Sequence, residues 1–173
     1  MGAAIARTIP MGCDYIRLLH VRQCLESCMA ETDRHLLVVG ASGVIGAAAV
    51  EHFAARPGWA VTGLSRREPV IRDESAFRHL ALDLSDRAAC AAGLKALPPV
   101  THLIYAAVRE APGLVSGWGD EGLIGVNGRM FSNILDGTLA RAGLQHLNLL
   151  QGVKAYGAHR HAVEIPLRES EPR

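Results

Sequence analysis

The sequence predicts an α/β fold in which a parallel sheet of about five strands carries helices on both faces. Short apolar runs alternate along the chain with longer segments of helical pattern, as in a series of β-α-β units. The chain has 173 residues, of which 49% are hydrophobic and 20% are charged. This length and composition suit one compact domain and exclude a disordered protein.

The expected strands are short and apolar, and turn or loop residues separate them from the helices. The first covers residues 36–39 and ends at Gly40, which is typical of a buried parallel strand. The others are expected at residues 59–64, 79–82, 101–105 and 147–150. In a doubly wound sheet of this kind, the expected strand order is 3-2-1-4-5.

Three helices are expected between these strands. The first covers residues 43–56 and is stopped by Pro57 and Gly58. The second covers residues 86–96, and two prolines follow it. The third covers residues 127–142 and ends at Gly143, a typical C-terminal cap.

Charge and cysteine usage exclude several classes of partner. The chain has 18 basic residues (Lys and Arg) and 17 acidic residues (Asp and Glu), and both kinds are scattered along it. No nucleic-acid surface is therefore expected. No apolar run is long enough to cross a membrane. The four cysteines lack the spacing of metal ligands, so no metal site is expected, and free thiols favour a reducing, cytoplasmic setting.

The domain itself is expected to cover residues 35–173. Residues 1–34 are expected to form an N-terminal extension outside the fold. They do not have the continuous apolar stretch followed by a cleavage site that is typical of a secretory signal. Met29 is a second candidate for the natural start, since a short polar lead then precedes the first strand.

The turn after the first strand has the pattern G-x-x-G-x-x-G. Glycines let the backbone turn tightly and approach a diphosphate, and the N–H groups that open the next helix attract its charge. The strand before the pattern and the helix after it favour a dinucleotide site over a merely tight turn. The candidate cofactor-binding residues here are Gly40, Ser42, Gly43, Val44, Ile45 and Gly46.

The second strand is followed by Ser65, Arg66 and Arg67. Sites selective for NAD usually hold an acid at this place, which binds the ribose 2′-hydroxyl. Two guanidinium groups instead match a 2′-phosphate in charge and geometry, so NADP(H) is the expected cofactor. The alternative is a solvated basic loop balanced by Glu68.

Two further segments follow strands at the same expected edge of the sheet. Asp83 and Leu84 come after the third strand, where the carboxylate is placed to accept the adenine amine or, equally, to act as an N-cap or turn residue. Small residues after the fourth strand, which let a cofactor lie against the backbone, are Ala106, Ala107 and Val108.

These segments resemble the extended short-chain dehydrogenase/reductases of the NAD-dependent epimerase/dehydratase type. The run from Gln151 to Gly157 and the residues Asn127, Met130 and Asn133 are similar to the branch of progesterone 5β-reductase and iridoid synthase-like enzymes. The resemblance covers about residues 35 to 173. It implies a Rossmann-type domain, a small-molecule substrate and a homodimer formed through the long helix. The alternative for this helix is that its apolar residues are buried against the sheet.

The resemblance implies that Lys154 is the catalytic lysine of this branch, where it acts with a tyrosine from a later motif. That motif does not occur in these 173 residues, and the chain is expected to lack the C-terminal substrate domain. Tyr105 and Tyr156 are interpreted as packing residues, and metal binding by His159 and His161 is not expected. The alternative to the catalytic role of Lys154 is that it is an exposed lysine in a loop.

Three functions therefore compete. The first is a reductase that uses NADP(H) on a carbonyl or enone, which Arg66 and Arg67 favour. The second is a nucleotide-sugar epimerase or dehydratase, in which the hydride is transferred and returned. The third is a cofactor-binding fragment without catalytic activity.

Overall fold

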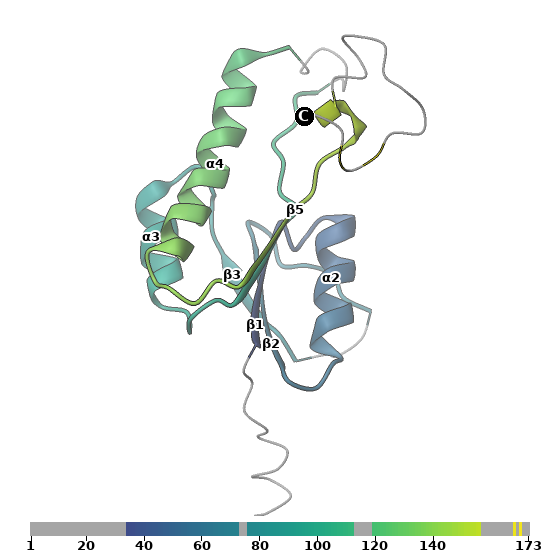
Figure 1. Cartoon of the computed structure of the whole chain (residues 1–173), viewed down its shortest axis with the longest axis vertical. Helices are drawn as coiled ribbons and strands as arrows, with labels where there is room; N and C mark the ends of the chain where they lie inside the picture. The colour runs from purple at the N-terminus through teal and green to yellow at the C-terminus, as the bar shows by residue number, and fades with distance from the viewer. Residues whose placement is uncertain (1–33, 73–75, 113–118, 157–167, 169, 171–173) are drawn as a thin grey trace, which may run out of the picture.

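A five-stranded parallel sheet forms the centre of the molecule (Figure 1). The computed structural model describes residues 34–72, 76–112, 119–156, 168 and 170. The strand order is β3-β2-β1-β4-β5, and every neighbouring pair is parallel, as the sequence predicted. The strands are β1 (Arg34–Val39), β2 (Trp59–Ser65), β3 (Arg78–Ala81), β4 (His102–Tyr105) and β5 (His146–Leu149).

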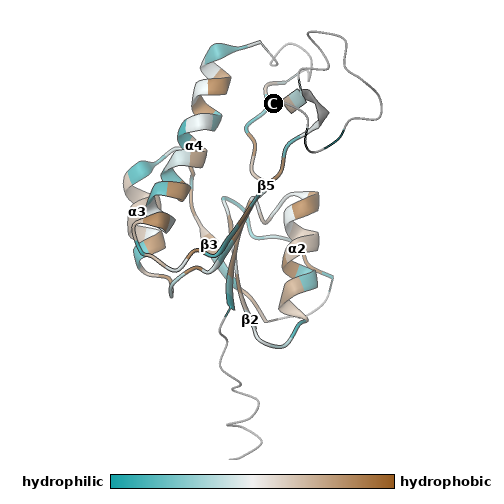
Figure 2. Ribbon diagram, in the orientation of Figure 1, coloured by the Kyte–Doolittle hydropathy of each residue, from teal (hydrophilic) through white to brown (hydrophobic). Residues whose placement is uncertain are grey.

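Helices cover both faces of this sheet (Figure 1). Helix α2 (Val44–Ala54) packs on one face, and α3 (Arg87–Lys95) and α4 (Glu121–Leu139) pack together on the other. Apolar residues run through all three helices, interrupted by polar ones (Figure 2). Strand β1 is buried on both sides, because Leu36 and Val38 pack with α2 while Leu37 and Val39 join the core under α3 and α4. Its continuous apolar run reflects this two-sided burial.

Helix α4 begins at Glu121, earlier than the predicted start at residue 127. Asp120 is its N-cap, and its carboxylate accepts a hydrogen bond from the backbone N–H of Leu123 at 3.1 Å. Gly122 and Gly125 hid this first part of the helix, because each glycine lowers helix stability by about 1 kcal/mol relative to alanine. The cap offsets part of that cost.

The other elements differ from their predicted bounds by at most two residues at either end. Strand β1 starts at Arg34, which the sequence analysis assigned to the N-terminal extension. The Arg34 guanidinium lies 4.7 Å from the ring centroid of Trp59, its partner in the register of β1 and β2. This cation–π contact adds to the strand pairing of the two residues. Residues 1–33, with the candidate start at Met29, lie outside the described residues.

In the part of the chain that the structure describes, no helix is both long and apolar enough to cross a membrane.

A buried histidine near the amino end of β1 contacts the middle of β2 and the loop before β4. His35 is 6% exposed, and its Nε2 lies 2.8 Å from the hydroxyl oxygen of Thr62. Its Nδ1 lies 3.3 and 3.2 Å from the carbonyl oxygens of Pro98 and Pro99. Since a carbonyl oxygen only accepts, Nδ1–H donates, and in the neutral ring Nε2 accepts from the threonine hydroxyl. Burial lowers the pKa of His35, although the two carbonyl groups oppose this shift.

We expect this histidine to make the fold sensitive to acid. Its pKa in the folded state lies below the usual value of 6.5, so its contribution to stability is complete above that pH and is lost as the pH falls toward the folded-state pKa. Thermal unfolding at pH 7.5 and pH 5.5 measures the loss. His35→Gln should be less stable at pH 7.5 but should lose less on acidification, and an unchanged pH dependence would contradict this account.

Tyr105 lies in the core on the side of α3 and α4, which confirms its interpretation as a packing residue. It is 5% exposed, and its ring meets Phe131 edge-on with centroids 5.0 Å apart. Burial raises the pKa of Tyr105 to about 12. Its hydroxyl group is buried without a hydrogen-bond partner among the described residues.

We therefore expect Tyr105→Phe to be more stable than the original chain. Removing an unsatisfied buried hydroxyl group relieves a desolvation cost, so the free energy of unfolding should rise by about 1 kcal/mol. Chemical denaturation measures it. A fall in stability would mean that the hydroxyl group has a partner after all.

Candidate functional site: a pocket at the carboxyl edge of the sheet

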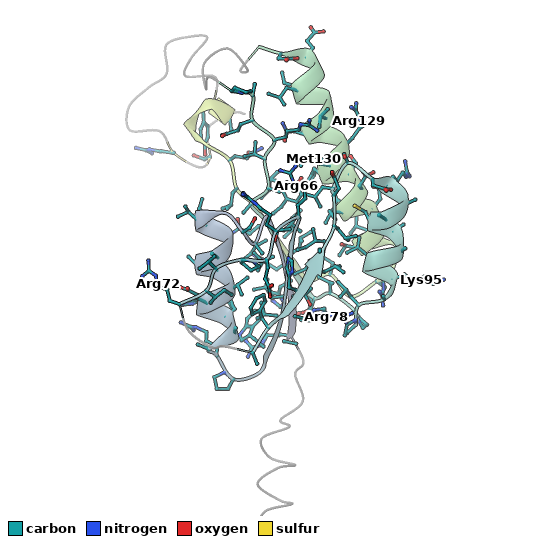
Figure 3. All side chains as sticks on the ribbon, turned by 180° about the vertical axis from the view of Figure 1, so that it is seen from behind. Arg66, Arg72, Arg78, Lys95, Arg129 and Met130 are labelled. Atoms are coloured by element: carbon teal, nitrogen blue, oxygen red, sulfur yellow. The ribbon has the colours of Figure 1, made fainter. Side chains whose placement is uncertain are left out.

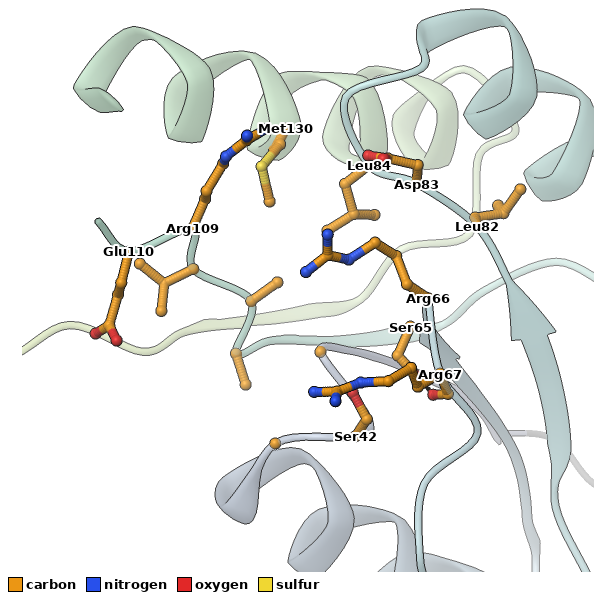
Figure 4. Close-up of a pocket in the computed structure, with 15 residues that line it drawn as sticks. Ser42, Ser65, Arg66, Arg67, Leu82, Asp83, Leu84, Arg109, Glu110 and Met130 are labelled. Atoms are coloured by element: carbon orange, nitrogen blue, oxygen red, sulfur yellow. Dashed lines mark hydrogen bonds between the residues drawn. The ribbon is translucent and has the colours of Figure 1, made fainter. Parts of the chain in front are cut away.

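A pocket of about 490 Å³ lies where β1, β2, β3 and β4 end (Figure 4). In an open α/β sheet this is the edge at which ligands bind. Its walls come from the loops that follow these strands and from α4. The residues that line it are Gly40, Ser42, Gly43, Ser65, Arg66, Arg67, Leu82, Asp83, Leu84, Ala106, Ala107, Val108, Arg109, Glu110 and Met130.

The glycine turn after β1 forms one wall. Gly40 has a φ of +88°, and its N–H donates to the carbonyl oxygen of Leu64 at 2.8 Å. Helix α2 then begins after Gly43, and no side chain caps its N-terminus. The N–H groups of its first turn are therefore available to an anion.

Gly46 makes this turn sterically possible. A Cβ atom at Gly46 would lie 2.1 Å from the carbonyl oxygen of Gly40 and 2.9 Å from the Cα atom of Ala41. The helix can therefore approach the turn only when residue 46 is glycine. Three predicted residues, Val44, Ile45 and Gly46, do not line the pocket; Val44 is 91% exposed, and Gly46 is buried under the turn.

Two arginines after β2 form the next wall. Arg66 and Arg67 are exposed, and neither guanidinium group is paired with an acid among the described residues (Figure 4). Ser65 fixes the backbone here, since its hydroxyl group donates to the carbonyl oxygen of Arg67 at 2.6 Å. The Nε2 atom of His79 on β3 lies 3.2 Å from the same hydroxyl oxygen, a contact that sequence analysis missed.

Asp83 acts as a turn residue in the loop after β3. Its Oδ1 accepts hydrogen bonds from the backbone N–H and the hydroxyl group of Ser85, at 2.9 and 2.7 Å. These bonds lower the pKa of Asp83, and Arg66 and Arg109 lower it further. Asp86, not Asp83, is the N-cap of α3. Leu84 is held by Asn133 on α4, whose Nδ2 donates to the Leu84 carbonyl oxygen at 2.9 Å.

The loop after β4 closes the far side of the pocket. Ala106, Ala107 and Val108 line it as predicted for small residues, and Arg109 and Glu110 follow them. Four lining residues were not predicted, namely Leu82, Arg109, Glu110 and Met130. The first three lie next to predicted residues or one position further along the chain, whereas Met130 reaches the pocket from α4.

Lys154 follows β5 at the same edge of the sheet, in a short 3-10 helix, η1 (Val153–Tyr156). Its side chain, and the histidines at 159 and 161, lie outside the described residues. Within the described part of the chain, no group of three or more metal-ligating side chains comes together.

The sequence of this chain is similar to that of one enzyme family over most of its length. A model of the NAD dependent epimerase/dehydratase family matches residues 36–172. (S)-8-oxocitronellyl enol synthase from Nepeta cataria is 29% identical over 153 residues, which cover 79% of this chain and 36% of that protein. This chain therefore spans about a third of the length of that relative.

Solved structures have the same fold. UDP-glucose 4-epimerase matches with a TM-score of 0.57 at 17% identity, over 72% of this chain and 37% of that one. A short chain dehydrogenase from Leptospira borgpetersenii serovar Hardjo-bovis, solved with bound NAD+, matches with a TM-score of 0.52 at 22% identity, over 61% and 44% of the two chains. The fold is thus that of a Rossmann-type dinucleotide-binding domain, and the chain belongs to the NAD dependent epimerase/dehydratase family.

Proposed function

We propose that residues 34–173 form the NADP(H)-binding domain of a reductase that acts on a carbonyl or enone substrate. The observation that carries the choice of cofactor is the pair Arg66 and Arg67. The two residues follow β2 and line the pocket, and neither guanidinium group has an acidic partner among the described residues. A 2′-phosphate provides the charge and the acceptor oxygens that two such groups match.

The remaining walls fit the rest of a dinucleotide. Gly40, Ser42 and Gly43 would hold the diphosphate beside the uncapped start of α2, since the turn leaves the backbone accessible. Leu82, Leu84 and Met130 offer an apolar surface to the adenine ring. The pocket therefore provides separate regions for the phosphates and for the base.

Bound NADPH supplies a hydride to such a substrate. Lys154 follows β5 at the edge where the other loops meet. In the branch that this chain resembles, the lysine holds the nicotinamide ribose and lowers the pKa of a tyrosine that protonates or stabilises the substrate oxygen. We assign the first of these roles to Lys154. The homodimer and the cytoplasmic location stay predictions.

The second candidate is an epimerase or dehydratase, which the family match favours. Such an enzyme returns the hydride to its substrate and consumes no coenzyme. A cofactor-binding unit without turnover is the third. All three functions use the same pocket, and only the reductase has a net consumption of coenzyme.

Fluorescence titration with NADPH and NADH tests the proposed cofactor. We expect NADPH to bind at least about tenfold more tightly, because charged hydrogen bonds to a phosphate contribute more than 1 kcal/mol. NADPH consumption with a panel of enones then separates a reductase from the other two functions. Equal affinity for both coenzymes would contradict the assignment of Arg66 and Arg67.

A further inference from the structure

The loop after β4 is fixed to α4 by one asparagine. The backbone N–H of Arg109 donates to Asn127 Oδ1 at 2.7 Å, and Asn127 Nδ2 donates to the carbonyl oxygen of Arg109 at 2.9 Å. The same Nδ2 also donates to the carbonyl oxygen of Leu123 at 3.0 Å, which ties the amide to its own helix. The Asn127 side chain therefore binds both the backbone N–H and the backbone carbonyl group of Arg109.

This arrangement leaves the Arg109 side chain in the pocket. Its guanidinium group has no hydrogen-bond or ion-pair partner among the described residues, and it lies beside Met130 (Figure 4). The neighbouring Glu110 points away from it (Figure 4). Arg109 and Arg66 come from opposite sides of the pocket (Figure 4), and both contribute to the lowered pKa of Asp83, after the two hydrogen bonds from Ser85.

The chemistry around Arg109 differs from that of a phosphate site. Leu84 and Met130 are 7% and 9% exposed, and Val108 adds an apolar side chain that is 65% exposed. The glycine turn, by contrast, offers backbone N–H groups at the start of α2. A flat aromatic base therefore fits the end of the pocket near Arg109, and the phosphates fit the other end.

We propose that Arg109 contacts the adenine ring of the cofactor by guanidinium stacking, and that Asn127 is the positioning residue that holds it there. This inference rests on the proposed function and adds a residue to it. A planar guanidinium group over an aromatic face is favourable, and the 2′-phosphate is not involved. Arg109 therefore contributes equally to NADPH and NADH binding, whereas Arg66 and Arg67 distinguish between them.

Binding measurements on the full chain test this division. Arg109→Ala should weaken NADPH, NADH and 5′-AMP by a similar factor of about 2 to 30, and should leave the NADPH-to-NADH ratio unchanged. Arg109→Lys should recover little, because an ammonium group keeps the charge but cannot stack as a plane. Asn127→Ala should weaken the same three ligands, and to a smaller extent than Arg109→Ala.

The matched control is Arg129→Ala, which removes an exposed arginine from α4 outside the pocket (Figure 3). It should bind all three ligands as the original chain does. Unchanged affinity in Arg109→Ala, a loss confined to NADPH, or full recovery in Arg109→Lys would each overturn the stacking role. If the original chain binds neither coenzyme, the proposed function fails and this inference fails with it; in the other cases the inference alone fails.

Discussion

Gly46→Ala is expected to destabilise the chain severely and to abolish dinucleotide binding. The added Cβ would lie 2.1 Å from the carbonyl oxygen and 2.7 Å from the carbonyl carbon of Gly40. Both are backbone atoms, so no side chain can move aside, and the turn or the helix must shift. Overpacking of this kind costs about 1–3 kcal/mol or more, and a shifted helix no longer presents the N–H groups of its first turn to a diphosphate.

The matched control for this variant is Gly128→Ala. Gly128 lies in α4, and a Cβ there meets no atom within 4 Å. Alanine should therefore stabilise the helix by about 1 kcal/mol and leave cofactor binding unchanged. Thermal unfolding and NADPH titration of both variants measure the two effects. If Gly46→Ala unfolds and binds as the original chain does, helix α2 does not approach the turn as described.

Arg66→Ala combined with Arg67→Ala is expected to weaken NADPH binding by about 100-fold and NADH binding by less than about threefold. The two guanidinium groups line the pocket without an acidic partner among the described residues, so their loss leaves the 2′-phosphate uncompensated. NADH lacks that phosphate, and its diphosphate is expected to bind at the glycine turn, away from these side chains. Titration of both coenzymes measures the difference.

A control with the same change in charge is Arg56→Ala combined with Arg72→Ala. Both residues are exposed and neither lines the pocket. This variant should retain the preference for NADPH, apart from a small effect of net charge that salt screens. Equal losses for NADPH and NADH in the Arg66 and Arg67 variant would show that these residues do not recognise the 2′-phosphate.

Much of the fold was predictable because its signals are local. Residues 36–39 read as a buried strand since every side chain of that run is apolar, and burial of β1 on both faces is the reason. The glycine turn was predictable because only glycine lets the backbone of the turn and of the following helix come so close together. The early start of α4 was missed because Gly122 and Gly125 weaken the helical pattern, whereas the cap at Asp120 is a single residue.

The far wall of the candidate site was less predictable because tertiary contacts create it. Met130 lines the pocket only because α4 crosses the loop after β4, and the amide of Asn127 that holds Arg109 is a long-range contact. The local sequence offered two functions for Asp83. Its bonds to Ser85 show the turn role, and contact with the adenine amine stays a prediction.

A crystal structure of the chain soaked with NADPH is the most direct test of the central claim. The predicted result is density for the diphosphate against the backbone of Gly40 and Gly43 at the start of α2, with the 2′-phosphate beside Arg66 and Arg67. Coenzyme bound at another surface, or an empty pocket at saturating NADPH, would contradict it.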